Sequence, residues 1–489
     1  MILSFASNLF ITCIIIGFSY LFKNFLLSQK NDITNIDFIY GIFFIIILSI
    51  ISNFLIPLKY FKIIIFPFGI FFFFIGIIKK KIKINFFVIS FFLFFFSFFT
   101  YWNGNNADSP VYHFQTIIWA YEYKIPFGLA ILDWHYALNS VWHIFLSSFS
   151  TKIFNFNSIY VINFIPFVFL FGISFYLKNN NLSTLALKFS SIFLLLFSLI
   201  HPYKNGIIFN HLGNPEVDTM AMIFFIICGY LFLLFFENQK KSQLNIFIQL
   251  SICSLMCILI KLSYIGVIFF PLVILFYKIN FKIFYGRAFI ISYIFVSLWS
   301  LRNFFLSSCL IFPIKNTCIK TSWSLNNEQV LFYLNQTKSF ARDTRLRAKY
   351  TDFEHTIYSH DWIIPWVKDY LFNDAFLGIS IILILISILS CLAFNYLIPK
   401  KKLGILDFNL FKILIILFLL NFYLWFQNPE IRFGWGIFIF FSCVLFSLVV
   451  KQIDYFKILL NYLNYIKILL IFLICLKNLS NFELKNIYT

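Results

Sequence analysis

Residues 38–58 read FIYGIFFIIILSIISNFLIPL, an apolar run that carries no charged side chain. A run of this length and composition can cross the hydrocarbon core of a bilayer as an α-helix. Similar runs recur along the 489-residue chain, of which 61% is hydrophobic and only 12% charged. They exclude a transmembrane β-barrel, whose strands are roughly 10 residues long and alternate in polarity. The sequence therefore predicts an all-α, polytopic helical membrane protein.

Apolar runs and the polar breaks between them predict about 14 transmembrane helices. The predicted spans are residues 1–22, 38–58, 63–78, 84–101, 158–177, 183–200, 218–236, 244–260, 264–277, 288–306, 375–398, 408–426, 433–450 and 457–476. The first run has no basic start and no small-residue cleavage site, so we expect a membrane helix there and not a cleaved signal peptide. Two long polar segments divide these spans. The predicted organisation is N-terminal membrane helices (1–101), a first major outer loop with interfacial helices (102–157), central membrane helices (158–306), a small outer subdomain (307–374) and C-terminal membrane helices (375–489).

Five basic clusters predict the orientation of the spans. If the spans alternate, all five clusters lie on one side, which the positive-inside rule assigns to the cytoplasm. Lys59 and Lys62 disagree, because the same scheme places them outside. Most of the 19 acidic residues and all seven histidines then lie on the extracytoplasmic face, where we expect the function. The clusters are Lys79 to Lys83, Lys240 with Lys241, Lys278 to Arg287, Lys400 to Lys402, and Lys451.

The first outer loop contains a polar stretch that departs from the composition of the chain, NGNNADSPVYHFQTIIWAYEYKIPFGLAILDWHYALNSVW at residues 103–142. Its acids and imidazoles include Asp108, His113, Asp133 and His135. A membrane protein gathers such side chains on one aqueous face mainly where it binds or reacts with something. The loop is therefore the first candidate for a functional site.

Asp108 precedes a predicted interfacial helix. Val111, Phe114, Ile118 and Tyr121 share one helical face, which predicts a helix lying on the membrane surface. Because proline suits the first helical position, Asp108 or Ser109 is expected to be the N-cap. A carboxylate at the rim of a water-filled cavity can also act as a base, so both roles stay open for Asp108. His113 lies five residues later and need not face it.

Two further outer segments carry candidate groups. The stretch HPYKNGIIFNHLGNPEVD at residues 201–218 contains His211, Glu216 and Asp218. Its glycines and proline predict a turned conformation, in which the two carboxylates can bind a divalent metal, orient a sugar hydroxyl, or simply begin the next helix. The stretch KSFARDTRLRAKY at residues 338–350 is basic, which suits either an anionic ligand or an ordinary solvated helix. An oxidising periplasm would also permit a disulfide between Cys309 and Cys318.

Three isolated cations lie where spans meet the outer surface: Lys261, Arg302 and Arg432. Such residues can snorkel to the interface, or they can converge on the phosphate of a membrane-embedded lipid. The middle of nearly every span lacks ionisable residues, which disfavours an ion-coupled transporter. The net charge of +19 follows from the cytoplasmic loops and predicts no nucleic-acid partner. No glycine-rich phosphate loop occurs, so the sequence predicts no nucleotide site.

The arrangement resembles the GT-C superfamily of polytopic membrane glycosyltransferases. The stretch DSPVYHFQTIIWAYEYKIPFGLA, with NSVW after it, resembles the first outer loop of bacterial relatives of the dolichyl-phosphate-mannose protein mannosyltransferases. KLSYIG, LRNFFLSSCLIFPI and NPEIRFGWG resemble later segments of the same group. The resemblance implies an inverting enzyme that uses a polyprenyl-phosphate sugar. One departure is that Asp108 follows two asparagines and lacks the adjacent acidic pair common in the superfamily, so metal dependence and the second acidic partner stay open.

The expected reaction assigns a role to each candidate. Asp108 would be the base that deprotonates the acceptor hydroxyl, with Glu216, Asp218 and Asp133 as supporting acids. Lys261, Arg302 and Arg432 would bind the donor phosphate, and His113, His135 and His211 would make polar contacts.

The expected function is sugar transfer to a glycan, lipid or protein acceptor on the periplasmic or extracellular face of the bacterial inner (plasma) membrane. Membrane lipid is an expected partner. Two alternatives remain: a flippase or transporter of lipid-linked saccharide, and a non-catalytic membrane scaffold. Movement of substrate without bond formation distinguishes the first alternative, and tolerance of single changes to the loop carboxylates distinguishes the second.

Overall fold

The structure is a computed structural model. It describes residues 2–29, 31–97, 108–150, 152–153, 156–157, 163–177, 180–200, 214–237, 240–278, 286–343, 353–371, 374–397, 405–452 and 462–474.

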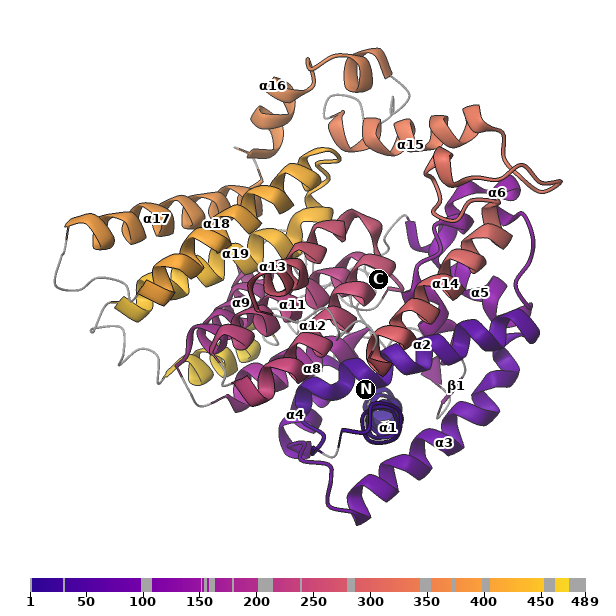
Figure 1. The fold of residues 1–489 in the computed structure, drawn as a ribbon, viewed down its shortest axis with the longest axis horizontal. Helices are drawn as coiled ribbons and strands as arrows, with labels where there is room; N and C mark the ends of the chain where they lie inside the picture. The colour runs from indigo at the N-terminus through magenta and orange to yellow at the C-terminus, as the bar shows by residue number, and fades with distance from the viewer. Residues whose placement is uncertain are drawn as a thin grey trace, which may run out of the picture.

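Helices dominate these ranges and follow the predicted spans (Figure 1). Among the described residues, nine helices are long and apolar enough to cross a membrane: α1 (Ile2–Leu21), α2 (Phe38–Leu55), α3 (Leu58–Ile78), α11 (Asp218–Glu237), α12 (Lys240–Ile260), α14 (Arg287–Ser307), α17 (Ala375–Leu397), α18 (Ile405–Phe426) and α19 (Ile431–Gln452). Shorter apolar helices occupy the other predicted spans: α4 (Phe86–Ser97), α8 (Phe164–Tyr176), α9 (Leu182–Ile200), the 3₁₀ turn η7 (Leu262–Ile268) continuing into α13 (Phe269–Lys278), and Tyr462–Ile474. A multi-pass helical membrane protein is confirmed, whereas the number of 14 crossings stays a prediction.

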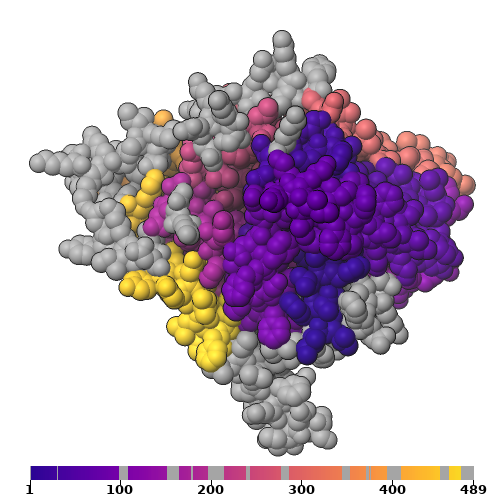
Figure 2. Space-filling view, turned by 90° about the horizontal axis from the view of Figure 1, so that it is seen from below, coloured from indigo at the N-terminus to yellow at the C-terminus, as the bar shows by residue number. Residues whose placement is uncertain are grey.

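The helices differ in how deeply they are buried. In the apolar stretch of α11, 89% of the residues are buried, compared with 28% in α3. α11 contacts α9, α12 and α19 in the middle of the molecule, whereas α3 lies at its edge (Figure 1). In the view from below, the indigo and purple N-terminal helices occupy the middle of the face, beside the yellow C-terminal segment (Figure 2). The exposed Phe68, Phe71 and Phe74 of α3 form the kind of surface that a bilayer covers.

Small residues allow the N-terminal helices to approach closely. A Cβ atom on Gly17 of α1 would overlap the backbone carbonyl of Gly69 in α3, and one on Gly41 of α2 would overlap the carbonyl of Ile15 in α1. Membrane helices commonly use small residues in this way. Lipid is as apolar as the helix surfaces, so the hydrophobic effect does not drive helices together and close van der Waals packing has to do so.

The first outer segment folds into short helices. A π-helical turn η4 (Ser109–His113) leads into α5 (Phe114–Glu122), which is followed by α6 (Leu129–Leu132), the 3₁₀ turn η5 (Trp134–Ala137), α7 (Val141–Ser148) and the two-residue strands β1 (Lys152–Ile153) and β2 (Phe156–Asn157), which pair antiparallel. Val111 and Ile118 are exposed, which suits the interfacial helix that the sequence predicts. α7 differs from a surface loop, because all of its residues are buried against α2, α3, α5 and α12.

The start of α3 lies beside the first outer segment. The Lys59 ammonium lies 2.7 Å from the carboxylate of Glu122, and Lys62 donates to the hydroxyl of Tyr121 at 3.2 Å. The two lysines that disagree with the charge rule therefore lie on the side where the predicted topology places them. We call the side of residues 108–150 the outer side. The pairing with α5 explains why these lysines are found there.

The third outer segment shares its core with the first. It contains the 3₁₀ turn η9 (Lys315–Thr317), α15 (Asn327–Arg342), the π-helical turn η11 (Glu354–Tyr358), α16 (Ile363–Trp366) and the π-helical turn η12 (Val367–Leu371). A small apolar cluster joins Leu306, Phe312 and Val330 to Leu129 and Ala137 of the first outer segment. The described parts of these two outer segments therefore share one apolar cluster.

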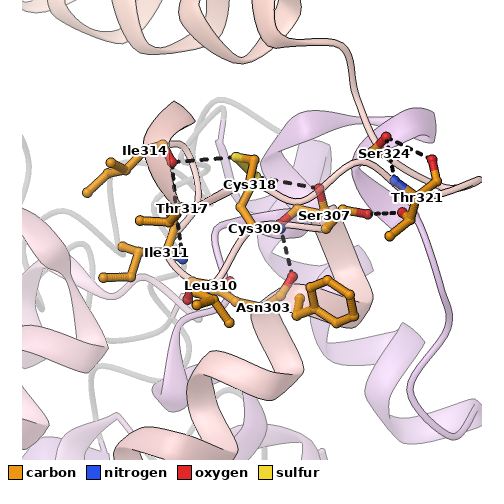
Figure 3. Close-up of a disulfide and its surroundings, with 12 residues drawn as sticks. Asn303, Ser307, Cys309, Leu310, Ile311, Ile314, Thr317, Cys318, Thr321 and Ser324 are labelled. Atoms are coloured by element: carbon orange, nitrogen blue, oxygen red, sulfur yellow. Dashed lines mark hydrogen bonds between the residues drawn. A yellow bond between two sulfur atoms is a disulfide. The ribbon is translucent and has the colours of Figure 1, made fainter.

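A disulfide links Cys309 and Cys318 in this small core (Figure 3). The backbone between the two cysteines turns back on itself, where Leu310 donates to the Thr317 carbonyl at 3.0 Å and the Thr317 hydroxyl donates to the Ile311 carbonyl at 3.0 Å. The sequence permitted this bond without requiring it. The bond closes this turn and places Cys309 in the small apolar cluster.

Candidate functional site

Asp108 lies immediately before the π-helical turn η4 and points to another part of the chain. Among the described residues, its side chain makes no capping hydrogen bond. Instead, Nη1 of Arg432 donates to Oδ2 of Asp108 at 3.2 Å. Asp108 therefore occupies the N-cap position that the sequence predicts, with Pro110 in the first turn, but its side chain does not cap η4. The carboxylate is held where α19 begins.

Arg432 lies in the first turn of α19 and contacts three carboxylates. Besides Asp108, its Nε donates to Oε1 of Glu430 at 3.3 Å, and its Nη1 lies 3.8 Å from Oδ2 of Asp218. Asp218 is the first residue of α11. The guanidinium thus joins the first outer segment to the outer ends of α11 and α19.

Lys261 completes this group from a fourth segment. It follows the last residue of α12, and its ammonium is paired with Oδ1 of Asp218. The same ammonium lies 3.7 Å from the centre of the Phe433 ring, which is an electrostatically favourable position. The Asp218 side chain is only 6% exposed, so it is a buried carboxylate that two cations stabilise.

Glu216 lies in the turn before α11 and is also buried. Its charge reaches Lys261 and adds to the effects of Asp108 and Asp218 on Tyr112. Burial, with help from these acids, raises the pKa of Tyr112 well above its usual value, so this phenol stays protonated. We call Asp108, Glu216, Asp218, Lys261, Glu430 and Arg432 the charged cluster.

Two histidines lie beside the charged cluster. Nδ1 of His113 lies 2.9 Å from Nε2 of His143, and both rings are buried. Burial lowers the pKa of His143 to about 3 and that of His113 well below its usual value, with His143, Lys261 and Arg432 adding to the effect on His113. Both imidazoles are therefore neutral at pH 7.

Asp133 and His135 form a separate pair at the edge of this region. Nδ1 of His135 lies 2.7 Å from Oδ1 of Asp133, and the carboxylate also accepts from the His135 backbone at 2.9 Å. The His135 ring stacks on Tyr112 with centres 4.8 Å apart. Asp133 therefore caps the turn η5 and contacts His135 and not the charged cluster.

Arg302 lies deeper, on α14. It is 3% exposed and donates to the side-chain oxygen of Asn139. Asn139 is held by two hydrogen bonds with Trp299, and its neighbour Ser140 donates to the carbonyl of Ile260 at 2.8 Å. In the described part of the chain, Nε of Arg302 has no hydrogen-bond partner. Arg302 is thus near the region through Asn139 and Ser140, but the structure does not bring it into the charged cluster.

Other sequence candidates lie elsewhere. His211 lies outside the described residues, as do Arg345, Arg347 and Lys349. Arg342 donates to the carbonyls of Thr356 and Gln427, both at 2.8 Å, so it connects α15 to the turn between α18 and α19. Within the described ranges, no group of three or more His, Cys, Asp or Glu residues could hold a metal ion. The sequence left metal dependence open, and the described part of the molecule offers no ligand set for a divalent metal.

Sequence reasoning missed two members of this region. Glu430 was not chosen, although it lies two residues before Arg432 in the NPEIRFGW stretch. His143 directly follows the polar stretch at residues 103–142 but was assigned no role. Only the contact with His113 distinguishes it.

These features define a class: a polytopic α-helical membrane protein with a charged, partly buried site at the outer ends of its helices. The chain belongs to the family described as "Domain of unknown function (DUF8201)", whose model matches residues 1–439. No curated protein and no solved structure matches the chain. The family description names no activity, so the function has to be argued from the charged cluster.

Proposed function

We propose that this protein is an integral membrane glycosyltransferase that moves a sugar from a polyprenyl-phosphate donor to a cell-envelope acceptor on the outer side of a bacterial inner membrane. The observation that carries the proposal is the 3.2 Å contact between Asp108 and Arg432, with Lys261 on the same buried carboxylate of Asp218. A carboxylate and two cations at the end of the membrane helices match the needs of transfer from a lipid phosphate.

The proposed reaction is a single displacement. The acceptor hydroxyl oxygen forms a bond to the anomeric carbon of the donor sugar, and the bond from that carbon to the phosphate oxygen breaks. Asp108 takes the hydroxyl proton, and the electron pair leaves with the polyprenyl phosphate. Arg432 and Lys261 stabilise the charge that grows on the leaving phosphate.

Asp108 and the donor phosphate would both bind Arg432. In the structure Arg432 donates a hydrogen bond to the carboxylate of Asp108 at 3.2 Å. A donor phosphate competes with Asp108 for the same guanidinium. Donor binding then weakens the contact between Asp108 and Arg432, which frees the carboxylate oxygen to accept the hydroxyl proton.

A path for the lipid chain adjoins Arg302. A hollow of about 350 Å³ lies on the exposed face of α14 and ends at Leu301, the neighbour of Arg302. Its walls are mostly apolar, as a polyprenyl chain requires, and consist of Ile290, Tyr293, Ile294, Ser297, Leu298 and Leu301. This hollow supports a donor whose lipid chain lies along the exposed face of α14.

The test is donor titration with purified protein and a panel of polyprenyl-phosphate sugars. Arg432→Gln should raise the KM for the donor at least tenfold, because a phosphate contact is lost in the ground state as well as in the transition state. Glu122→Gln is the matched control, since Glu122 pairs with Lys59 in the same outer segment but outside the charged cluster. Donor that crosses vesicles without forming a bond would favour a flippase, and an unchanged KM in Arg432→Gln would remove Arg432 from the phosphate site.

A further inference from the structure

The end of α8 and the beginning of α9 lie on the inner side of the molecule, opposite the charged cluster. α11 begins at Asp218 in that cluster and ends at Glu237, and a helix of this length rises about 30 Å. The Glu237 carboxylate accepts from the Ser183 backbone at 3.0 Å and from the Ser183 hydroxyl, so α9 (Leu182–Ile200) starts on the inner side. α8 runs from the outer side to the inner side, because Asn163 at its start donates to the carbonyl of Asn214 before the charged cluster.

Lys467 is a fully buried cation near the inner end of α8. Its ammonium donates to the carbonyl of Ser174 at 3.0 Å and to the hydroxyl of the same residue at 3.2 Å. Asn464, one turn earlier in the same helix, donates to the carbonyl of Phe175 at 3.1 Å. The centre of the Phe175 ring lies 5.5 Å from the ammonium. These neutral groups orient the ammonium but do not balance its charge.

A second buried lysine lies on α9. Lys188 is 4% exposed and follows Ser183 by five residues, which places it about 7.5 Å along the helix from the inner end. α9 packs against α8, and the charge of Lys188 acts on Lys467. In the described part of the chain, neither ammonium is paired with a carboxylate. Two like charges therefore lie together in an apolar environment.

Other lysines in the interior of this protein do have a carboxylate partner. The Lys23 ammonium lies 2.8 Å from Oδ2 of Asp37, and Lys261 is paired with Asp218. Pairing is expected, because a charge removed from water is costly unless an opposite charge accompanies it. A lysine near a helix end can also extend its ammonium to water, but Lys467 is fully buried. The two lysines thus require a negative charge that the described residues do not supply.

We propose that Lys467 and Lys188 form a phosphate-binding site on the inner side of the membrane, for which the headgroup of an anionic lipid is the natural source of the phosphate. Phosphate oxygens accept strong hydrogen bonds from ammonium groups and supply the missing charge. Basic pockets between membrane helices on the cytoplasmic side bind lipid headgroups in this way. Both lysines lie within about two helical turns of the inner ends of α8 and α9, where a headgroup can reach them. The site does not depend on the proposed function.

The test compares thermal unfolding of the purified full-length protein with added phosphatidylglycerol, phosphatidylcholine or inorganic phosphate. Phosphatidylglycerol should raise the midpoint by about 2–4 °C more than phosphatidylcholine, whose headgroup has no net charge. Lys467→Met should lose this difference. Lys451→Met is the matched control and should keep it, because it removes an exposed lysine at the inner end of α19. An equal shift with inorganic phosphate that Lys467→Met abolishes would support the phosphate site and overturn the lipid as its source.

The sign of the substitution gives a second readout. Without anionic lipid, Lys467→Met and Lys188→Met should be at least as stable as the wild type, because each removes a buried charge that lacks a counter-charge. With phosphatidylglycerol, the wild type should be the most stable of the three. A neutral amine needs no counter-ion, so equal wild-type midpoints in the two lipids would overturn the inference.

Native mass spectrometry decides the question independently of unfolding. The wild type and Lys451→Met should retain bound phosphatidylglycerol, and Lys188→Met should release it even if Lys467→Met does not fold. Retention of the lipid by Lys188→Met to the same extent as by the wild type would contradict the site.

Discussion

Nη1 of Arg432 donates to Oδ2 of Asp108 at 3.2 Å, although 324 residues separate the two in sequence. The contact joins the first outer segment to the start of α19. Because Arg432 also reaches Asp218 on α11, the position of Asp108 depends on the helix bundle as well as on its own loop. Changes on α11 or α19 should therefore alter the chemistry of Asp108.

Removing Lys261 should destabilise the fold. Lys261→Met leaves the buried carboxylate of Asp218 without its closest cation, and breaking a buried pair from one side costs about 3–5 kcal/mol. Lys261→Arg keeps the charge and should stay close to the wild type. The midpoint of thermal unfolding in detergent checks this prediction, with Lys59→Met as a control from an exposed pair. Equal midpoints for Lys261→Met and the wild type would show that the pair contributes nothing.

Acid should destabilise the protein through its buried histidines. Burial lowers the pKa of His143 to about 3, whereas the unfolded chain has the usual value near 6.5. The unfolded state therefore binds more protons below pH 6.5, so stability is complete above that pH and falls as the pH drops toward 3. The loss from His143 alone should reach ~2 kcal/mol at pH 5. Thermal unfolding midpoints between pH 7.5 and pH 5 measure this loss of stability. A His143→Gln variant whose midpoint falls with pH as steeply as that of the wild type would contradict the attribution to His143.

Loss of the disulfide should loosen the small outer core. Cys309 and Cys318 are nine residues apart. A disulfide that closes a loop of that size lowers the entropy of the unfolded chain, which stabilises the folded state by about 3 kcal/mol. Replacing both cysteines by alanine should make residues 307–343 more susceptible to proteolysis while the membrane helices remain intact. Mass spectrometry before and after reduction checks the bond itself. Two alkylated cysteines at these positions without reduction would show that the segment is not in an oxidising compartment.

The topology predicts opposite labelling of two surface positions. Glu122 lies on the outer side next to Lys59, whereas Lys80 follows α3 at its other end. A membrane-impermeant thiol reagent added to intact cells should label Glu122→Cys and leave Lys80→Cys unlabelled until the membrane is opened. The reverse pattern would invert the orientation.

The helical membrane fold could be predicted from the sequence because hydropathy is a local property. A run such as residues 38–58 has to satisfy its backbone hydrogen bonds internally in lipid, whatever surrounds it. Each predicted span has a helix in the structure, including short ones such as α4 and α8. The number that cross the membrane depends on lengths and tilts, which hydropathy does not give.

The candidate site could be predicted only in part. The sequence placed Asp108 and Arg432 on the same side of the membrane, but the contact between them depends on the packing of α19 against α11. The π-helical turn after Asp108 has no local sequence signal, since its residues fit an α-helical pattern. The Cys309–Cys318 bond was permitted by position alone, and the pairing of His113 with His143 required the buried position of α7.

The most direct measurement of the central claim is transfer of labelled sugar from polyprenyl-phosphate donors to cell-envelope acceptors by purified protein, beside its Asp108→Asn variant. The substituted amide keeps the size of the side chain but cannot take a proton. The account predicts transfer by the wild type and a loss of at least about 100-fold in the variant, which should still bind the donor. Transfer by Asp108→Asn at the wild-type rate would contradict the account.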